Sequence, residues 1–373
     1  MKHAALLLAL LAGCCLPGVA RAEQGPSVHS RAFLIEDART GDVLASYHAH
    51  AHLPIASITK LMTVLVVLEH KRLTDVVTVD RRAAAVGEET LDLHADEQIT
   101  VRDLIKGALI QSANDAADAL ALSVAPDFAS FASLMNAKAA ELGLTDTHFV
   151  RPDGLDAAGA YSSAADVTQL ARDLMRIRFV RQTVREETDT IAGGRVLHTW
   201  DDLLSLNPRV IGVKTGHTNA AGWCQVAAVR GRGVTVYATL LGGPTRSVRN
   251  VDLESLLAWG LAQFRVVPAI QGARTYAEVR LPYGRRSLGL VTAGPLQAVV
   301  RLRRSLSERV VAAVAVSLPV ARGTVLGRVE VWDGQRLVGR RDLVASRTVN
   351  RPGLPARLGW YAGRTFHHLV HLF

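Results

Sequence analysis

Residues 54–63 read Pro54-Ile55-Ala56-Ser57-Ile58-Thr59-Lys60-Leu61-Met62-Thr63, and they decide most of what this 373-residue chain can be. After Lys60 the sequence is almost entirely apolar up to Leu68, and a helix that is apolar on every side is buried within a domain. Residues three apart on a helix share a face, so a helix that begins at or just before Ser57 places Ser57 beside Lys60. The start of a helix also favours developing negative charge, because its first N–H groups are unpaired. This stretch therefore predicts a serine hydroxyl and a lysine amine side by side at the start of a buried helix.

Two further strings follow in a fixed order. Ser112-Ala113-Asn114 begins 55 residues after Ser57, and Lys214-Thr215-Gly216 begins 102 residues after Ser112. Such a set is typical of acyl-enzyme hydrolases in which a lysine activates a serine nucleophile. Each string is common by itself, and the first alone equally fits a core helix with a capping serine and a lysine that reaches the surface. Their order and separation favour the catalytic interpretation.

The proposed base must be uncharged to accept a proton. An ordinary lysine, with a pKa of about 10.4, is a free amine at pH 7 in about one molecule in 2,500. Lowering its pKa by about 3 units corresponds to roughly 4 kcal/mol, which burial and a second nearby cation can supply. We expect Lys214 to be that cation and Asn114 to hold Lys60 in place. Ser112 would relay the proton to the leaving amine, while Lys214 and Thr215 bind a carboxylate at the end of the substrate.

The sequences around these strings extend the pattern. They are residues 54–63, Ser112-Ala113-Asn114-Asp115-Ala116-Ala117, Met135-Asn136-Ala137-Lys138-Ala139, Leu142-Gly143-Leu144-Thr145-Asp146-Thr147-His148-Phe149, Asp153-Gly154-Leu155 and Gly212-Val213-Lys214-Thr215-Gly216-His217-Thr218. In these segments the chain resembles the low-molecular-weight penicillin-binding proteins that are serine D-alanyl-D-alanine carboxypeptidases, the peptidase S11 family. The resemblance is strong over about residues 30–265 and looser beyond them.

The resemblance implies a role for each motif residue. Ser57 is the acyl-ester nucleophile, Lys60 accepts its proton, and Ser112 relays the proton; these are the catalytic residues. The backbone N–H groups of Ser57 and His217 form the oxyanion hole. Gly216 lets an extended substrate backbone approach closely. The substrate-binding residues are Asn114, Lys214, Thr215, Gly216 and His217.

The implied reaction removes the terminal D-alanine from peptidoglycan pentapeptide stems, with β-lactam antibiotics as covalent inhibitors and no cofactor or metal. Two alternatives are a D,D-endopeptidase that cuts cross-links and a slow or non-catalytic penicillin-binding wall protein. A class A β-lactamase is disfavoured because no Glu-x-x-Leu-Asn lies between Ser112 and Lys214. The chain departs from the family at His198-Thr199-Trp200-Asp201-Asp202, where the family often has Asn-rich sequence.

The hydrophobic pattern predicts a mixed α/β (α+β) protein. Phe33–Ile35 and Val43–Ala45 flank Thr40-Gly41-Asp42, which predicts a hairpin at the start of an antiparallel sheet. Residues 57–185 are mostly helical in pattern. We therefore expect a β-lactamase/transpeptidase-like domain over residues 23–265, with an antiparallel sheet, a helical cluster and the site between them.

The sequence pattern changes after residue 265. Short apolar strands follow Pro268, and Asp333-Gly334 between two of them is a strong hairpin signal. Residues 266–350 are expected to form a small all-β domain, with a spacer as the favoured role. Residues 351–373 are expected to form an amphipathic helix that associates with a membrane surface. Its apolar side would carry Leu358, Tyr361, Ala362, Leu369 and Phe373, and its basic side Arg357, Arg364, His368 and His371.

Charge is divided unevenly along the chain. From residue 266 to the end there are 17 arginines and only five acidic residues, so this part is more basic than the whole chain, whose formal net charge is +9. The preceding residues are net acidic. Such asymmetry indicates an anionic partner for the C-terminal part. We expect an anionic membrane surface or cell-wall polymer rather than nucleic acid, because the chain begins with an export signal.

Residues 1–22 are expected to be that signal peptide. A short basic start precedes the apolar run Ala4–Leu16, and Ala20-Arg21-Ala22 fits a cleavage site. The run is too short to span a membrane stably. Leu11-Ala12-Gly13-Cys14 offers lipoprotein processing as an alternative. The expected location is the periplasmic face of the cytoplasmic membrane, with peripheral attachment.

Cysteine and histidine add little chemistry. After cleavage Cys224 is the only cysteine, so no internal disulfide forms, and its apolar surroundings predict a buried strand. His48, His50 and His52 alternate as they would on one face of a strand. No carboxylate or cysteine lies at ligand spacing nearby, so we expect a solvated loop and no metal.

Overall fold

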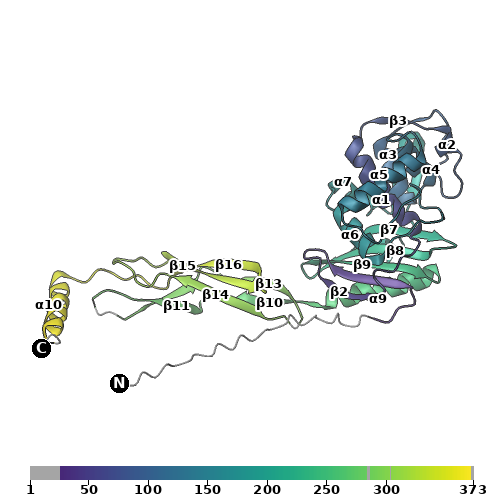
Figure 1. The fold of residues 1–373 in the computed structure, drawn as a ribbon. Helices are drawn as coiled ribbons and strands as arrows, with labels where there is room; N and C mark the ends of the chain where they lie inside the picture. The colour runs from purple at the N-terminus through teal and green to yellow at the C-terminus, as the bar shows by residue number, and fades with distance from the viewer. Residues whose placement is uncertain (1–25, 284–285, 303, 371–373) are drawn as a thin grey trace, which may run out of the picture.

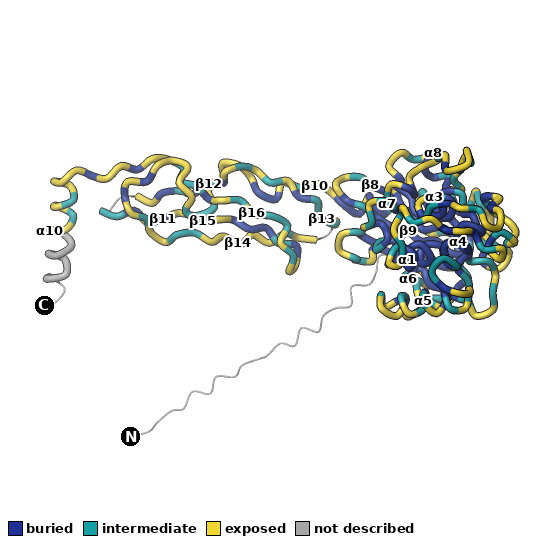
Figure 2. Tube along the Cα trace, turned by 90° about the horizontal axis from the view of Figure 1, so that it is seen from above, coloured by how far each residue is buried: buried dark blue, intermediate teal, exposed yellow. Residues whose placement is uncertain are grey.

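The computed structural model describes residues 26–283, 286–302 and 304–370. The chain forms a mixed α/β part followed by an elongated β-rich part, and helix α10 (Leu354–Val370) lies at the far end of the latter (Figures 1 and 2). The predicted fold class is confirmed.

The first part is built on a five-stranded antiparallel sheet with strand order β2-β1-β9-β8-β7. The strands are β1 (Ala32–Asp37), β2 (Val43–Tyr47), β7 (Val210–Thr218), β8 (Gly222–Gly231) and β9 (Val234–Gly243). The predicted hairpin is β1–β2. Strand β7, which carries the third motif, lies at one edge of the sheet.

Helices cover both faces of this sheet (Figure 1). They are α1 (Lys60–His70), α2 (Arg81–Ala84), α3 (Val101–Lys106), α4 (Asn114–Leu122), α5 (Phe128–Glu141), α6 (Ala164–Leu174), α7 (Arg178–Thr183), α8 (Leu203–Leu206) and α9 (Arg246–Ala262). Successive strand residues point to opposite faces. Leu34 therefore packs in the core shared with the helical cluster, whereas Phe33 and Ile35 pack in the core that contains α9 residues. Two short strand pairs lie at the margins, β3 (Val76–Thr78) with β4 (Gln98–Thr100) and β5 (Thr188–Thr190) with β6 (Val196–His198).

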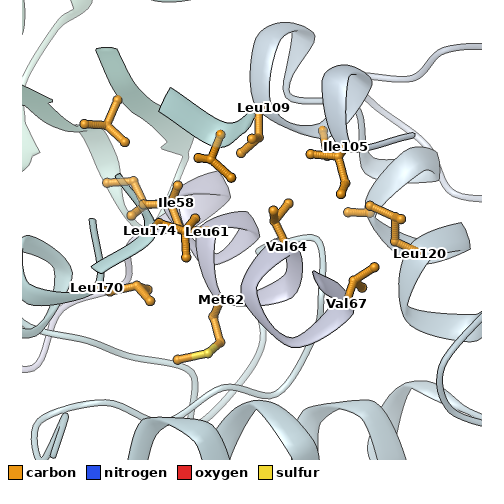
Figure 3. Close-up of a cluster of buried hydrophobic side chains, with 14 of the residues drawn as sticks. Ile58, Leu61, Met62, Val64, Val67, Ile105, Leu109, Leu120, Leu170 and Leu174 are labelled. Carbon is orange, nitrogen blue, oxygen red and sulfur yellow. The ribbon is translucent and has the colours of Figure 1, made fainter. Parts of the chain in front are cut away.

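Helix α1 lies in the middle of the larger core, as its all-round apolar sequence predicts (Figure 3). Leu61, Met62, Val64 and Val67 on this helix are all buried. The predicted start of the helix is corrected in one respect. The first turn, η1 (Ala56–Thr59), is a 3-10 helix, and α-helical geometry begins only at Lys60.

The second part is all β. Its main sheet has the order β11-β12-β16-β15-β14, beside the pair β10–β13. The strands are β10 (Phe264–Ile270), β11 (Thr275–Val279), β12 (Leu288–Thr292), β13 (Leu296–Arg301), β14 (Leu306–Ala312), β15 (Val325–Asp333) and β16 (Arg336–Ala345). The predicted β15–β16 hairpin forms, with Asp333 paired to Arg336, so Gly334 (φ 61°) and Gln335 are the turn residues. Val329, Val331 and Leu343 give this part its own buried core.

No helix in the described residues is long and apolar enough to cross a membrane. At the start of α10, Leu354, Leu358 and Tyr361 are exposed. The side chains of Arg364, His368 and Leu369 are not described, and His371, Phe373, the predicted signal peptide and Cys14 lie outside the described residues.

Candidate active site

Ser57 lies in the 3-10 turn η1, directly before α1. Side chains three apart eclipse in 3-10 geometry, so this turn sets Ser57 in line with Lys60. Gly154 packs against the turn from a distant loop. A Cβ at Gly154 would lie 2.2 Å from the carbonyl oxygen of Ala56, and its φ of +82° is itself unfavourable for other residues. The loop thus fixes the turn that carries the serine, and only glycine fits at the contact.

Lys60 is completely buried, and its amine faces three oxygen atoms. Its Nζ atom lies 2.8 Å from Ser57 Oγ. It also donates to Oδ1 of Asn114 at 2.7 Å and to the backbone oxygen of Asp153 at 2.5 Å. A neutral amine has two N–H donors and one lone pair. Because the amide and carbonyl oxygens only accept, they take both N–H groups and leave the lone pair for the Ser57 hydroxyl.

Burial lowers the pKa of Lys60 to about 8, while the carboxylates of Asp153 and Asp118 act in the opposite direction. Lys214 is also buried, and its pKa is held well below the usual range by burial and by the nearby charge of Lys60. The sequence suggested that Lys214 helps to lower the pKa of Lys60. The structure instead attributes the shift chiefly to burial, because the next largest influences on Lys60 are acidic and raise its pKa.

Ser112 follows a π-helical turn, η2 (Gly107–Gln111), and has a left-handed backbone with φ 67°. Strained backbone of this kind is common at functional sites. Lys214 Nζ donates to Ser112 Oγ at 2.8 Å and to the backbone oxygen of Thr215 at 3.0 Å. Since Asn114 contacts Lys60, the middle string joins the first and third strings at one place.

A cavity of about 270 Å³ opens onto the serine. It is lined by Ser57, Glu88, Glu89, Ser112, Trp200, Thr215, Gly216, His217, Trp223 and Arg249. Lys60, Asn114 and Lys214 are buried beneath it. A Cβ at Gly216 would lie 2.7 Å from the oxygen of Ile55 and 3.1 Å from the Ser57 nitrogen. Glycine is therefore required here to let β7 pack against η1, whereas the sequence suggested substrate approach as the reason.

Half of this lining was not identified from the sequence: Glu88, Glu89, Trp200, Trp223 and Arg249. Trp223 stacks on His217 with a centroid separation of 4.1 Å, and the guanidinium of Arg249 lies 5.5 Å from the Trp223 ring centroid. These side chains come from β8, β7 and α9, which are far apart in the sequence and come together only when the chain folds. Of these five residues, only Trp200 could have been suspected from the sequence, because it lies in the segment that departs from the family.

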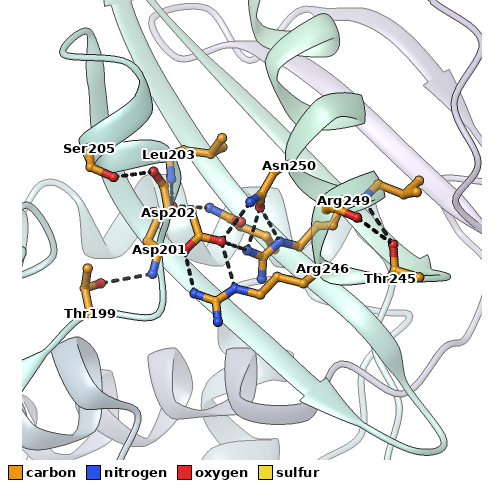
Figure 4. A network of polar contacts seen from close by, with 12 residues as sticks. Thr199, Asp201, Asp202, Leu203, Ser205, Thr245, Arg246, Arg249 and Asn250 are labelled. Carbon is orange, nitrogen blue, oxygen red and sulfur yellow. Dashed lines mark hydrogen bonds and ion pairs between the residues drawn. The ribbon is translucent and has the colours of Figure 1, made fainter.

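That segment builds one wall of the cavity through an ionic network (Figure 4). Asp202 accepts from Arg246 Nε at 2.8 Å and from Asn250 at 2.7 Å, and it lies 3.4 Å from Arg249. Trp200 donates from Nε1 to the Gln111 oxygen at 3.1 Å. Asp202 in the segment that departs from the family thus binds α9 to the side of the cavity that contains Trp200.

The remaining predictions concern residues away from the cavity. Asp146, about 95 positions along the chain, contacts His50 at 2.7 Å and His52 at 3.3 Å, so a carboxylate partner exists that sequence spacing could not reveal. Both histidines remain mostly exposed. Cys224 is buried in β8 as predicted, and burial raises the pKa of its thiol to about 11.

Comparisons with known proteins agree with this geometry. Residues 19–245 match the family model described as D-alanyl-D-alanine carboxypeptidase, peptidase S11. The D-alanyl-D-alanine carboxypeptidase DacC of Escherichia coli is 32% identical over 98% of both chains, and DacF of Bacillus subtilis is 28% identical over 84% of both. The crystal structure of penicillin binding protein 6B from Escherichia coli superimposes with a TM-score of 0.65 at 28% identity, covering 87% of this chain and 98% of that one.

Proposed function

The chain belongs to the peptidase S11 family of D-alanyl-D-alanine carboxypeptidases, and on this premise we propose that Ser57 is its nucleophile and Lys60 its general base. The protein is a serine carboxypeptidase that releases the terminal D-alanine of peptidoglycan peptides and binds penicillins. One observation carries the residue assignment. The Lys60 amine lies 2.8 Å from the Ser57 hydroxyl, while its other two contacts are oxygen atoms that only accept hydrogen bonds.

The reaction then proceeds in two halves. Ser57 Oγ attacks the carbonyl carbon of the penultimate D-alanine and its proton passes to Lys60. The N–H groups of Ser57 and His217 receive the oxyanion. The peptide C–N bond breaks, and the departing amine takes the proton from Lys60 through Ser112, which Lys214 holds in place, so Lys60 is again a free amine. Water then attacks the ester and gives a proton to Lys60, and the Ser57 oxygen leaves with that proton.

The same cavity accounts for recognition of a C-terminal carboxylate. Thr215 lines it, Lys214 lies beneath it, and Arg249 adds a further cation on the same wall. Asn114 holds Lys60, and Gly216 with His217 forms the β7 edge along which an extended peptide can lie. We propose that the terminal D-alanine binds at this edge, with its carboxylate toward Thr215 and Lys214.

Mass spectrometry of the intact protein tests the assignment. Incubation with benzylpenicillin is expected to add one penicilloyl group to the wild-type chain and none to Ser57→Ala. An adduct of equal yield on Ser57→Ala would overturn the nucleophile. Free D-alanine release from a pentapeptide, compared with cleavage of cross-linked dimers, distinguishes the carboxypeptidase from the disfavoured endopeptidase.

We propose further that the protein is exported and attaches peripherally to the periplasmic face of the cytoplasmic membrane through α10. The exposed apolar side chains Leu354, Leu358 and Tyr361 support this proposal. The 17 arginines against five acidic residues after residue 265 favour an anionic lipid surface. The intervening β-rich part separates α10 from the catalytic part (Figure 1).

A further inference from the structure

Trp200 is an aromatic side chain in the catalytic cavity that the reaction above does not use. It lines the cavity together with Ser57 and Ser112, and it is 36% exposed. It also lies in the segment 198–202, where the chain departs from the family. Aromatic walls in such cavities contribute to the choice of ligand. A residue in this position can therefore change which substrates fit without changing the chemistry at the serine.

The indole ring of Trp200 is held in place by three contacts. Its Nε1 atom donates to the Gln111 backbone oxygen at 3.1 Å. The guanidinium of Arg246 lies 5.2 Å from the ring centroid, within the range of a cation–π contact. The next residue in the chain, Asp201, is buried and accepts from the side-chain nitrogen of Gln225 at 2.7 Å. A wall that is fixed in this way does not move aside readily for a larger ligand.

The same contacts place the ring on the side of the cavity from which the amine departs. Gln111 directly precedes Ser112, which passes the proton to the leaving amine. Arg246 shares the carboxylate of Asp202 with Arg249, which adds a cation for the carboxylate of the substrate (Figure 4). The residue that leaves carries its amine and its carboxylate on one carbon atom. Its side chain starts from that same carbon atom and therefore lies near the indole ring.

We propose that Trp200 is a specificity-determining residue whose indole bounds the leaving-group side of the cavity and restricts the released residue to one with a small side chain. The proposal rests on the proposed function, in which the terminal carboxylate points toward Thr215 and Lys214. The methyl group of D-alanine fits beside the ring, whereas a longer side chain meets it. The same limit acts against cross-linked peptides, because their leaving group is a second stem peptide. Trp200 thus favours the carboxypeptidase reaction over the endopeptidase reaction.

The experiment compares two soluble pentapeptides that differ only in the last residue, D-alanine or D-leucine. The wild type should release D-alanine with the higher kcat/KM. Trp200→Ala opens the wall, so kcat/KM for D-leucine release should rise relative to that for D-alanine by about tenfold or more, the selectivity that even one methylene group gives in a pocket. Trp200→Phe keeps an aromatic ring at the cavity and loses only the N–H bond to Gln111, so it should keep most of the wild-type ratio.

Trp332→Ala is the matched control, because Trp332 has the same two kinds of side-chain contact. The guanidinium of Arg309 lies 5.2 Å from its ring centroid, and its Nε1 atom donates to Glu330 at 3.3 Å. Trp332 lies on β15, however, and does not line the cavity. The ratio of the two kcat/KM values in this variant should equal that of the wild type.

A ratio that shifts toward D-leucine in Trp200→Ala, and in neither of the other two variants, supports the proposal. An unchanged ratio in Trp200→Ala would overturn it, as would an equal shift in Trp200→Phe or Trp332→Ala. Equal release of the two residues by the wild type would also overturn it, and that measurement needs no variant to fold. Benzylpenicillin labelling of Ser57 is followed in parallel. A wild-type chain that takes no label contradicts the proposed function rather than the role of Trp200.

Discussion

The Nζ atom of Lys60 lies 2.8 Å from the Oγ atom of Ser57, although the α-helix itself starts only at Lys60. The 3-10 turn η1 produces this contact, because residues three apart eclipse in that geometry. The first helical turn is thus tightened where the chemistry takes place, and burial of the amine supplies the pKa at which it can act as a base.

Replacing Lys60 by arginine should abolish this base while keeping a buried cation. A guanidinium group stays protonated, so it cannot accept the Ser57 proton. Acylation by benzylpenicillin should slow by about 10²–10⁴-fold, the usual contribution of a general base. Lys138→Arg, at a surface lysine that contacts Glu69 and Glu141, should acylate at the wild-type rate. A Lys60→Arg rate within threefold of the wild type would count against the assignment.

Replacing Ser112 by alanine tests the proton relay. Ser112 Oγ accepts from Lys214 at 2.8 Å, so its loss removes the path to the leaving amine. The kcat/KM for D-alanine release should fall by roughly 10²-fold or more. Ser123→Ala is the matched control, because the Ser123 hydroxyl donates to the Leu120 oxygen within its own helix region and Ser123 lies outside the cavity. Equal rates for the two variants would exclude the relay.

Alanine substitutions at Gly154 and Gly159 distinguish the cost of backbone strain from the cost of a steric clash, because the two glycines have nearly the same φ. Gly154 has φ +82° and a Cβ there would meet the Ala56 oxygen at 2.2 Å, whereas Gly159 has φ +84° and open space around it. Gly159→Ala should cost about 1–2 kcal/mol of unfolding free energy from the left-handed backbone alone. Gly154→Ala should cost more and should also slow acylation, because it displaces the turn that carries Ser57. Urea unfolding and penicillin acylation measure the two effects; similar values for both variants would contradict the contact.

Deleting residues 354–373 tests the membrane proposal. The truncated chain should move from the membrane fraction to the soluble fraction after correct export, and it should lose binding to vesicles that contain anionic lipid. Its D-alanine release from a soluble pentapeptide should be unchanged, since α10 lies far from the catalytic part (Figure 1). Unchanged fractionation of the processed protein would reject α10 as the anchor.

The residues that sequence reasoning found are those whose side chains carry the motif at fixed spacing, such as Ser57, Lys60 and Lys214. Contacts made by backbone atoms could not be predicted from the sequence. The most important of them is the hydrogen bond that the Asp153 carbonyl accepts from Lys60. Trp223 and Arg249 were not predicted as site residues, because only the pairing of β8 with β7 and the packing of α9 bring them to the cavity.

The same division holds for the fold. The β1–β2 hairpin and the buried helix α1 have strong local patterns, and both were predicted correctly. Before the β15–β16 hairpin, the sequence after Pro268 predicts strands at Ala277–Leu281, Ala298–Leu302 and Val310–Leu318, so β10 and β12 were missed. Strand β10 contains Pro268, which disfavours a strand interior, and β12 is a five-residue segment that contains a glycine, Gly289. Tertiary pairing overrides these local signals.

The pKa of Lys60 can be measured directly by following the side-chain nitrogen signals of ¹⁵N-labelled lysine with pH. The sequence has only six lysines, so the signal that disappears in Lys60→Arg can be assigned. We expect it to titrate at about pH 8. Below that pH the amine is protonated and cannot accept the Ser57 proton, so acylation should fall as the pH is lowered through the same value. A Lys60 signal that titrates near 10.4, as in an exposed lysine, would contradict a buried free amine as the base.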